Sequence, residues 1–128
     1  MEFIKTNAAP GAVGPYSQAV AHGELLFCSG QIPLDPATNV LLEADSATQA
    51  ALVLKNLRGL LEAGGSSMDR VVKTTMFLVS MDDFQAVNAV YAAAFGEHRP
   101  ARSTIEVSRL PKGARVEIEA IAIRSVPA

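Results

Sequence analysis

The sequence has few aromatic residues, a single cysteine and no long hydrophobic run. Its 128 residues include no Trp, two Tyr and five Phe, although hydrophobic residues of all kinds make up 49% of the chain. That fraction argues against intrinsic disorder. Because aromatic residues are few, the core must be built mainly from Leu, Val, Ile and Ala. No apolar run approaches the ~20 residues of a transmembrane helix, and the first residues lack the apolar segment of a secretory signal. We therefore expect no membrane partner.

The single cysteine, Cys28, cannot form an intramolecular disulfide, which fits a reducing compartment. It lies in the apolar segment ELLFCSG, whereas a reactive thiol needs a polar and partly exposed setting. We therefore expect Cys28 to be an inert core residue. Together with the missing signal peptide, the cysteine content predicts a cytoplasmic protein.

Signals for several kinds of chemistry are also missing. The formal net charge of −2 lacks the basic excess that marks most nucleic-acid-binding domains, so we expect no nucleic-acid partner. His22 and His98 have no cysteine, histidine or carboxylate at metal-ligand spacing, which predicts that no metal is bound. The sequence also contains no GxSxG elbow, Walker loop or GxGxxG motif.

The chain shows no repeat and no linker, so we expect a single domain spanning residues 1–128. Ser46 and Gln49 have the spacing of a capping box at the start of a helix, and Gly64 and Gly65 suit its left-handed end. Hydrophobic periodicity predicts two helices and five strands. The strands are two within 17–32 that turn at His22-Gly23, then 70–80, 102–107 and 115–124; the helices run from Ser46 to Gly64 and from Asp82 or Asp83 to Gly96.

This order of elements predicts an α+β fold in which two helices can cover only one face of the sheet. The strand 70–80 nevertheless has apolar residues on both faces, with one face holding Val72, Thr74, Met76 and Leu78 and the other Val71, Lys73, Thr75, Phe77 and Val79. The economical cover for the second face is another copy of the chain. We therefore expect a homo-oligomer that packs sheet faces together.

The last strand places carboxylates on that second face. Alternation points Val116, Ile118, Ala120 and Ala122 toward the helices, and Glu117 and Glu119 away from them. Buried carboxylates must be paired, hydrated or functional, because an unpaired buried charge is costly. Two interpretations of these carboxylates remain: structural Arg–Glu pairs where subunits meet, or a functional carboxylate. The segment upstream offers the candidate basic partners, which are Arg99, Arg102, Arg109, Lys112 and Arg115.

Four blocks of the sequence resemble, in order, the Rid family of enamine/imine deaminases, also called the YjgF-like family, and its RidA-type subgroup. The blocks are GPYSQAV (14–20), SGQIPLDP (29–36), VVKTTMFLVSMDDFQAVNAVY (71–91) and PARSTIEVSRLPKGARVEIEAIA (100–122). The resemblance implies a chorismate-mutase-like α+β domain with a mixed sheet and two helices on one face. It also implies a homotrimer with sites between subunits.

The resemblance further implies roles for seven residues. Arg102 corresponds to the residue that binds the substrate carboxylate, and Glu117 to the one that positions or activates water. The pocket would be lined by Tyr16, Ser29, Gly30, Asn88 and Thr104. Thr104 stands where relatives often have cysteine, and its implied role is through the backbone. Asn39 replaces a more usual glycine, and asparagine tolerates a left-handed turn.

The implied reaction is the hydrolysis of reactive 2-imino acids and enamines, such as 2-aminoacrylate and 2-iminobutanoate, to 2-oxo acids and ammonia. A protonated imine is already electrophilic, so the implied chemistry requires no metal or organic cofactor. The alternative function is a non-enzymatic trimeric protein of the same fold, either ligand-binding or chaperone-like.

Overall fold

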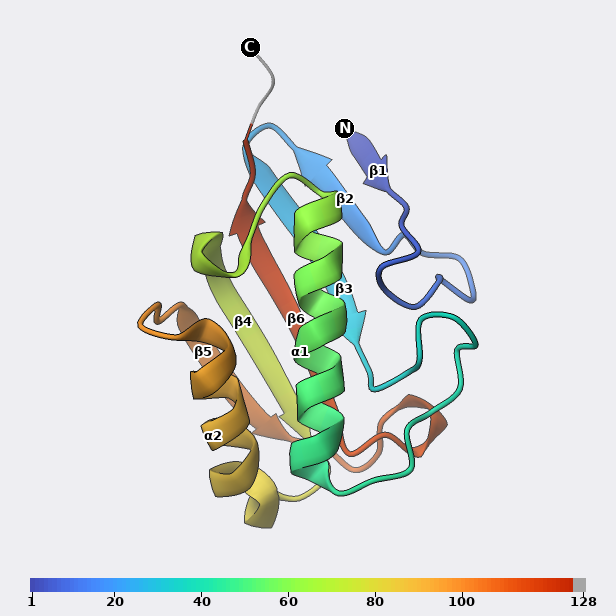
Figure 1. Cartoon of the computed structure of the whole chain (residues 1–128), viewed down its shortest axis with the longest axis vertical. Coiled ribbons are helices and arrows are strands. Elements are labelled where there is room, and N and C mark those ends of the chain that lie inside the picture. Colours follow the sequence, from blue (N-terminus) through green and yellow to red (C-terminus); the bar gives the residue numbers. More distant parts are fainter. Residues whose placement is uncertain (126–128) are drawn as a thin grey trace.

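Two helices pack on one face of a six-stranded mixed sheet in the computed structural model, which describes residues 1–125 (Figure 1). The strand order is β1-β2-β3-β6-β4-β5; β4 and β5 pair in parallel, and the other neighbours are antiparallel. The strands are β1 (Glu2–Ile4), β2 (Ala19–His22), β3 (Leu25–Gln31), β4 (Val71–Leu78), β5 (Ala101–Glu106) and β6 (Val116–Ile123); the helices are α1 (Ser46–Ala63) and α2 (Phe84–Phe95).

This architecture confirms the predicted α+β fold and adds one strand. The prediction missed β1, because three residues are too few to show an alternating pattern. β1 pairs antiparallel with β2 and extends the sheet at the edge opposite β5. Within the described residues, no helix is both long enough and apolar enough to cross a membrane.

The start of α1 differs from the predicted capping box. Asp45 is the N-cap, and its carboxylate accepts a hydrogen bond from the Thr48 N–H at 2.8 Å. Aspartate caps a helix as well as serine does, so the cap lies one residue earlier than expected. Ser46 is therefore inside the helix, where its hydroxyl donates to Asp83 Oδ2 at 2.6 Å. The amide of Gln49 bonds to loop backbone instead of to its own helix terminus.

The end of α1 follows the prediction in its main feature. Gly65 adopts a left-handed φ of 82°, whereas Gly64 does not. The N–H of Ser66 reaches back to the carbonyl of Leu61, and the N–H of Gly65 to that of Glu62. These two bonds satisfy carbonyls that the last turn leaves free.

The core lies between the sheet and the two helices, which run side by side across one face (Figure 1). The central strand β6 alternates as predicted, and the residues on its helix side are almost fully buried: Val116, Ile118, Ala120 and Ala122. They meet the apolar stripe of α1, formed by Val53, Leu54, Leu57, Leu60 and Leu61.

The predicted alternation of β4 is wrong at its first two residues. The pairing of β4 with β6 shifts between Val71 and Lys73, so Val71 is 2% exposed and Val72 is 45% exposed. An irregularity of this kind reverses the facing of the residues before it. From Lys73 onward the prediction holds, with Thr74 and Met76 buried under the helices.

The face of the sheet away from the helices is open in a single chain. It carries large apolar side chains that remain substantially exposed: Phe3, Leu25, Phe27, Ile105 and Ile123. Phe77, Glu117 and Ile121 lie half-buried among them on the central strands. An apolar face of this extent marks an interaction surface.

The N-terminal segment is held against α1 and β2 by a buried amide and a glycine. Gln18, which is 4% exposed, hydrogen-bonds through its side chain to the backbone of Thr6 and Pro10. Gly59 lets this segment approach α1 closely, because a Cβ at Gly59 would lie 2.5 Å from the backbone oxygen of Ala8.

Replacing Gly59 with alanine should destabilise the fold. In most helix interiors Gly→Ala stabilises by about 0.5–1 kcal/mol, but here the new methyl group meets a backbone carbonyl that cannot move freely. We expect a net loss of about 1–3 kcal/mol, the range for overpacking. Urea denaturation would measure it, with the exposed Glu62→Ala as a neutral control. A Gly59→Ala variant more stable than wild type would contradict the close approach.

Candidate functional site

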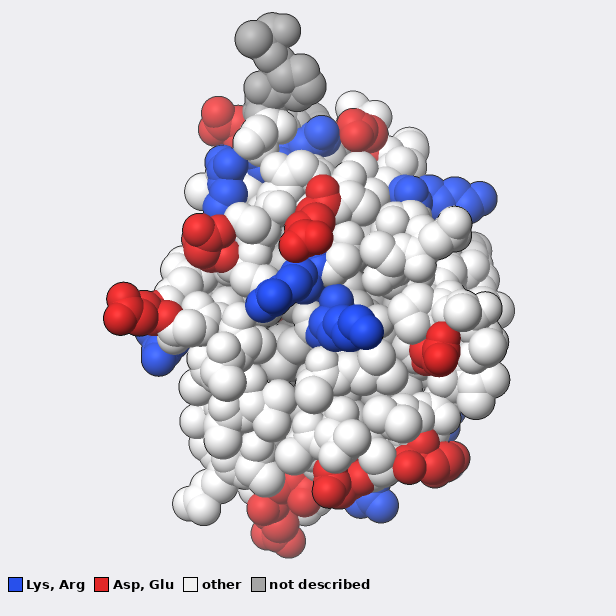
Figure 2. All heavy atoms as spheres, viewed as in Figure 1, with Lys and Arg blue, Asp and Glu red and all other residues white. Residues whose placement is uncertain are grey.

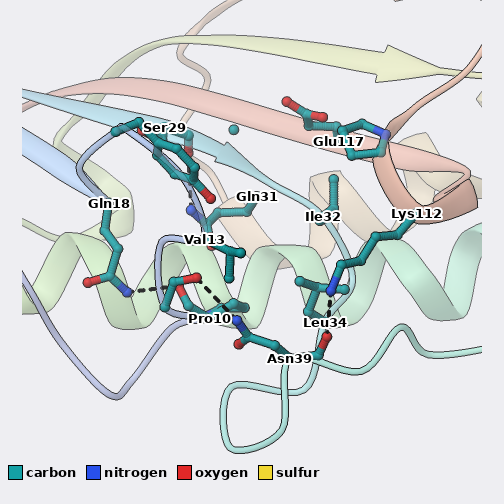
Figure 3. Close-up of a pocket in the computed structure, with 14 residues that line it drawn as sticks. Pro10, Val13, Gln18, Ser29, Gln31, Ile32, Leu34, Asn39, Lys112 and Glu117 are labelled. Atoms are coloured by element: carbon teal, nitrogen blue, oxygen red, sulfur yellow. Dashed lines mark hydrogen bonds between the residues drawn. The ribbon is translucent and has the colours of Figure 1, made fainter.

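A pocket of about 440 Å³ opens where the N-terminal loop, the end of β3 and the turn before β6 converge (Figure 3). The apolar residues that line it include Pro10, Val13, Ile32, Leu34 and Pro111. The polar groups that line it include Tyr16, Ser29, Gly30, Asn39, Lys112 and Glu117. Four of the seven predicted site residues therefore lie together: Tyr16, Ser29, Gly30 and Glu117.

A bulge in β3 shapes this pocket. Cys28 pairs with Ala120 and Gln31 with Ile118, so two residues of β3, Ser29 and Gly30, stand opposite one residue of β6. Bulges re-aim strand residues and are frequent beside active sites. Here the bulge brings the backbone of Gly30 against Glu117, and a Cβ at Gly30 would overlap Oε2 of that carboxylate. Only glycine permits this approach.

The electrostatics of Glu117 suit a proton acceptor. Burial raises the pKa of the Glu117 carboxyl above its ordinary value, and the negative charge of Glu119 on the same face raises it further. Within residues 1–125 neither glutamate forms an ion pair, and the one salt bridge found joins Arg124 to Glu2. The Arg–Glu pair considered from the sequence is thus not formed within this part of one chain. A carboxyl with a raised pKa works as a base closer to neutral pH.

Arg102 lies in a different place, on β5 beneath α2. Its guanidinium donates to Asn88 Oδ1 at 2.7 Å. It also lies over the rings of Tyr91 and Phe84, with its central carbon 4.7 and 5.6 Å from the respective ring centroids. Tyr91 is fixed in turn by a 2.7 Å hydrogen bond to Thr74. Stacking and hydrogen bonding hold the planar fork in one orientation, which favours bidentate binding of a carboxylate.

Arg102 and Glu117 face opposite sides of the sheet. Arg102 is in register with Thr74, which points toward the helices and bonds Tyr91 of α2. Glu117 is in register with Phe77, on the open face. Arg102 and Asn88 line a separate hollow of about 370 Å³ that shares no residue with the first pocket. Thr104, two residues further along β5, lines neither hollow.

Asn39 and Lys112 are among the pocket side chains that were not identified from the sequence. Both adopt left-handed backbone conformations, with φ of 57° and 58°. The expected left-handed turn at Asn39 is confirmed, but nothing in the pattern around Lys112 indicated that its side chain reaches the pocket. From the sequence, the LPKG segment (110–113) is typical of an ordinary turn. Its place beside the loop 33–41, where Lys112 donates to Asn39, is a feature of the tertiary structure.

Cys28 is buried under the helices. Loss of hydration raises the pKa of its thiol to about 12, so no thiolate forms near neutral pH. Across residues 1–125, no group of three or more His, Cys, Asp or Glu side chains is placed to hold a metal ion. The polar side-chain groups that line the pocket are one carboxylate, a phenol, an ammonium, a hydroxyl and carboxamides.

The sequence matches a protein-family model described as endoribonuclease L-PSP over residues 6–124. Among curated proteins, the 2-iminobutanoate/2-iminopropanoate deaminase of Salmonella typhimurium is 48% identical over 124 residues. The alignment covers 94% of this chain and 96% of that protein.

Solved structures share the fold closely. A putative endoribonuclease from Thermotoga maritima superposes with a TM-score of 0.94 at 51% identity, covering 98% of this chain and 99% of that one. TdcF from E. coli, solved with bound serine, gives a TM-score of 0.92 at 44% identity, covering 98% of this chain and 100% of that one.

Gly30→Ala tests whether the bulge positions the carboxylate. The added methyl group should push Glu117 toward solvent without unfolding the chain, because the displaced atoms end a flexible side chain. The pKa of Glu117 should then fall toward its ordinary value as burial is relieved. NMR titration of labelled glutamate measures the shift.

Gly11→Ala is the matched control for this titration. Gly11 lines the same pocket, and no atom of the described residues beyond its chain neighbours lies within 4 Å of where its Cβ would be. The added methyl group should therefore leave the pKa of Glu117 unchanged. An unchanged Glu117 pKa in folded Gly30→Ala as well would contradict the close approach of the bulge to the carboxylate.

Proposed function

The chain belongs to the endoribonuclease L-PSP family, also called the Rid or YjgF-like family, and we propose that it hydrolyses small 2-imino acids to 2-oxo acids and ammonia. The observation that carries the proposal is the Arg102 guanidinium, which lies over the Tyr91 ring and donates to Asn88, with no carboxylate partner among residues 1–125. Such a fork is complementary to the carboxylate of a 2-imino acid. The deaminase name of the Salmonella relative supports the same reaction.

Glu117 would supply the proton chemistry. With Arg102 holding the substrate carboxylate, the imine carbon is fixed and a water bound to Glu117 attacks it. Glu117 accepts a proton from the water as the C–O bond forms, and the carbon–nitrogen double bond becomes a single bond. The proton then passes to the amine of the resulting carbinolamine. As the C–N bond breaks and ammonia leaves, the carbinolamine hydroxyl gives its proton to Glu117, and its oxygen becomes the carbonyl oxygen of the 2-oxo acid. The proton on Glu117 then passes to the departing ammonia, which leaves as ammonium. The raised pKa of Glu117 suits both halves of this transfer.

Because Arg102 and Glu117 face opposite sides of one sheet, we propose that each site combines Arg102 from one chain with Glu117 from another. The assembly would be a homotrimer, as the resemblance to the Rid family implies. The exposed apolar side chains of the open face, among them Phe27 and Ile105, supply a surface for such contacts. Burial between chains would dry the pocket and strengthen the electrostatic contacts within it.

Two other functions compete. A ribonuclease, as the family description names, would need a surface that attracts phosphates, whereas the net charge is −2 and acidic and basic side chains are interspersed over the helix face (Figure 2). A non-enzymatic ligand-binding or chaperone-like protein would not require a base of raised pKa in the pocket. The raised pKa of Glu117 and the oriented Arg102 fork favour the enzyme.

The reaction can be tested by coupling the protein to a threonine dehydratase and following 2-oxobutanoate formation. Wild type should accelerate the step after dehydration. Arg102→Lys keeps the charge but loses the fork and its stacking, so we expect a ten- to hundredfold loss of kcat/KM, corresponding to about 1.5–3 kcal/mol. Lys55→Arg, at an exposed site on α1, is the control. Full activity in folded Arg102→Lys would remove the anchoring role.

The two-chain site predicts complementation between inactive variants. Arg102→Ala and Glu117→Gln should each be inactive alone. In trimers formed by co-refolding equal amounts of both, about a quarter of the sites should combine an intact Arg102 with an intact Glu117 and regain activity. Light scattering would check the trimer mass. Mixed trimers without activity would contradict a site shared between chains, because both residues would then have to come from one chain.

A further inference from the structure

One wall of the Glu117 pocket is held in place by a short relay of hydrogen bonds. The Lys112 ammonium donates to the backbone oxygen of Asn39 at 3.0 Å. The side-chain amide of Asn39 donates to the backbone oxygen of Gly11 at 3.3 Å. Three segments that are far apart in the sequence are thereby tied together around the pocket mouth (Figure 3).

Asn39 and Lys112 both adopt the left-handed backbone conformation. Within residues 1–125, Asn39 and Lys112 are the two residues other than glycine with positive φ. Asparagine tolerates this region, but lysine has no such preference, and Gly113 directly follows it. Strain of this kind persists where the surroundings over-determine it and is frequent at ligand sites. A lysine kept here at a cost to the backbone points to a role for its side chain.

The position of Lys112 suggests that role. Figure 3 shows its side chain running toward Asn39, and in this view Ile32 lies between the Lys112 ammonium and the Glu117 carboxylate. A substrate whose imine carbon lies at Glu117 would extend its side chain along Ile32 and Leu34 toward the Lys112 ammonium. An apolar substituent long enough to reach that point would have to desolvate the ammonium or break its bond to Asn39.

We propose that Lys112, hydrogen-bonded to the backbone oxygen of Asn39, is a specificity-determining residue that restricts the site to 2-imino acids with short side chains. This inference rests on the proposed imine hydrolysis and names the substrate class of the same pocket. In this proposal the Lys112–Asn39–Gly11 relay limits the length of side chain that the pocket accepts, so removing the ammonium should open the pocket to branched and longer side chains.

The test compares two substrates made by one source, an L-amino acid oxidase with catalase present. It forms the imine of L-2-aminobutyrate and the bulkier imine of L-leucine. Wild type should prefer the smaller imine. Lys112→Met keeps the length of the side chain but loses the donor, and it should reduce the kcat/KM ratio of small to large substrate by about tenfold, within the range for a change of one or two methylenes in a pocket. Lys112→Arg, which can still donate to Asn39, should retain most of the preference.

Asn39→Gly provides a second variant, because glycine keeps the left-handed turn and the carbonyl while removing the bond to Gly11. It should shift the ratio in the same direction, which keeps the inference testable if Lys112→Met does not fold. Lys55→Met, at an exposed position on α1 away from the pocket, should leave the ratio unchanged. Parallel losses on both substrates in the folded variants would show that the relay is only structural and would overturn the proposal.

Direct binding separates this inference from the proposed function. Calorimetry with 2-oxobutanoate and 4-methyl-2-oxopentanoate measures size discrimination without turnover. If wild type binds the shorter acid more tightly than the longer one but hydrolyses no imine, the proposed function fails. A shift of this affinity ratio in Lys112→Met would still support the role of Lys112 in size discrimination. If wild type hydrolyses imines and neither ratio moves in Lys112→Met or Asn39→Gly, only the wall is wrong.

Discussion

The fold depends on the alternation of side chains along β6, the strand paired with both β3 and β4 at the centre of the sheet. One face of β6 is aliphatic and lies under α1, which fixes its register, because a slip by one residue would put Glu117 and Glu119 into the core. The same alternation makes the carboxylates face away from the helices. The strand that stabilises the core thus also carries Glu117, the base of the proposed reaction.

Two irregularities interrupt this regular sheet. The bulge in β3 brings Gly30 against Glu117, and the missing side chain of Gly30 leaves room for the carboxylate. The shift at the start of β4 moves Val71 into the core and Val72 out of it. Both changes occur where backbone pairing is adjusted by a single residue, so little of the ladder of hydrogen bonds is lost while the side chains are re-aimed.

The charged groups of the chain are arranged so that a single copy leaves them incomplete. Glu117 has a raised pKa and no cationic partner among the described residues, and Arg102 is oriented by aromatic rings and an amide rather than by a carboxylate. Groups held ready in this way gain most from an anionic substrate and a water placed between them. The open apolar face and these unpaired charges are the two features that support the proposed contact with a second chain.

The sequence by itself determined the helices, five of the six strands and the alternation of β6, because hydrophobic periodicity is a local property and aliphatic residues recur at the right spacing. The left-handed turns at Asn39 and Gly65 were also local. Tertiary structure alone decided that Asp45 rather than Ser46 caps α1, since the Ser46 hydroxyl donates a hydrogen bond to Asp83. It also decided the bulges, which arise from pairing between distant strands, and the separation of Arg102 from Glu117, which depends on the order β6-β4-β5. Lys112 became a pocket residue only when residues 73 positions apart were brought into contact.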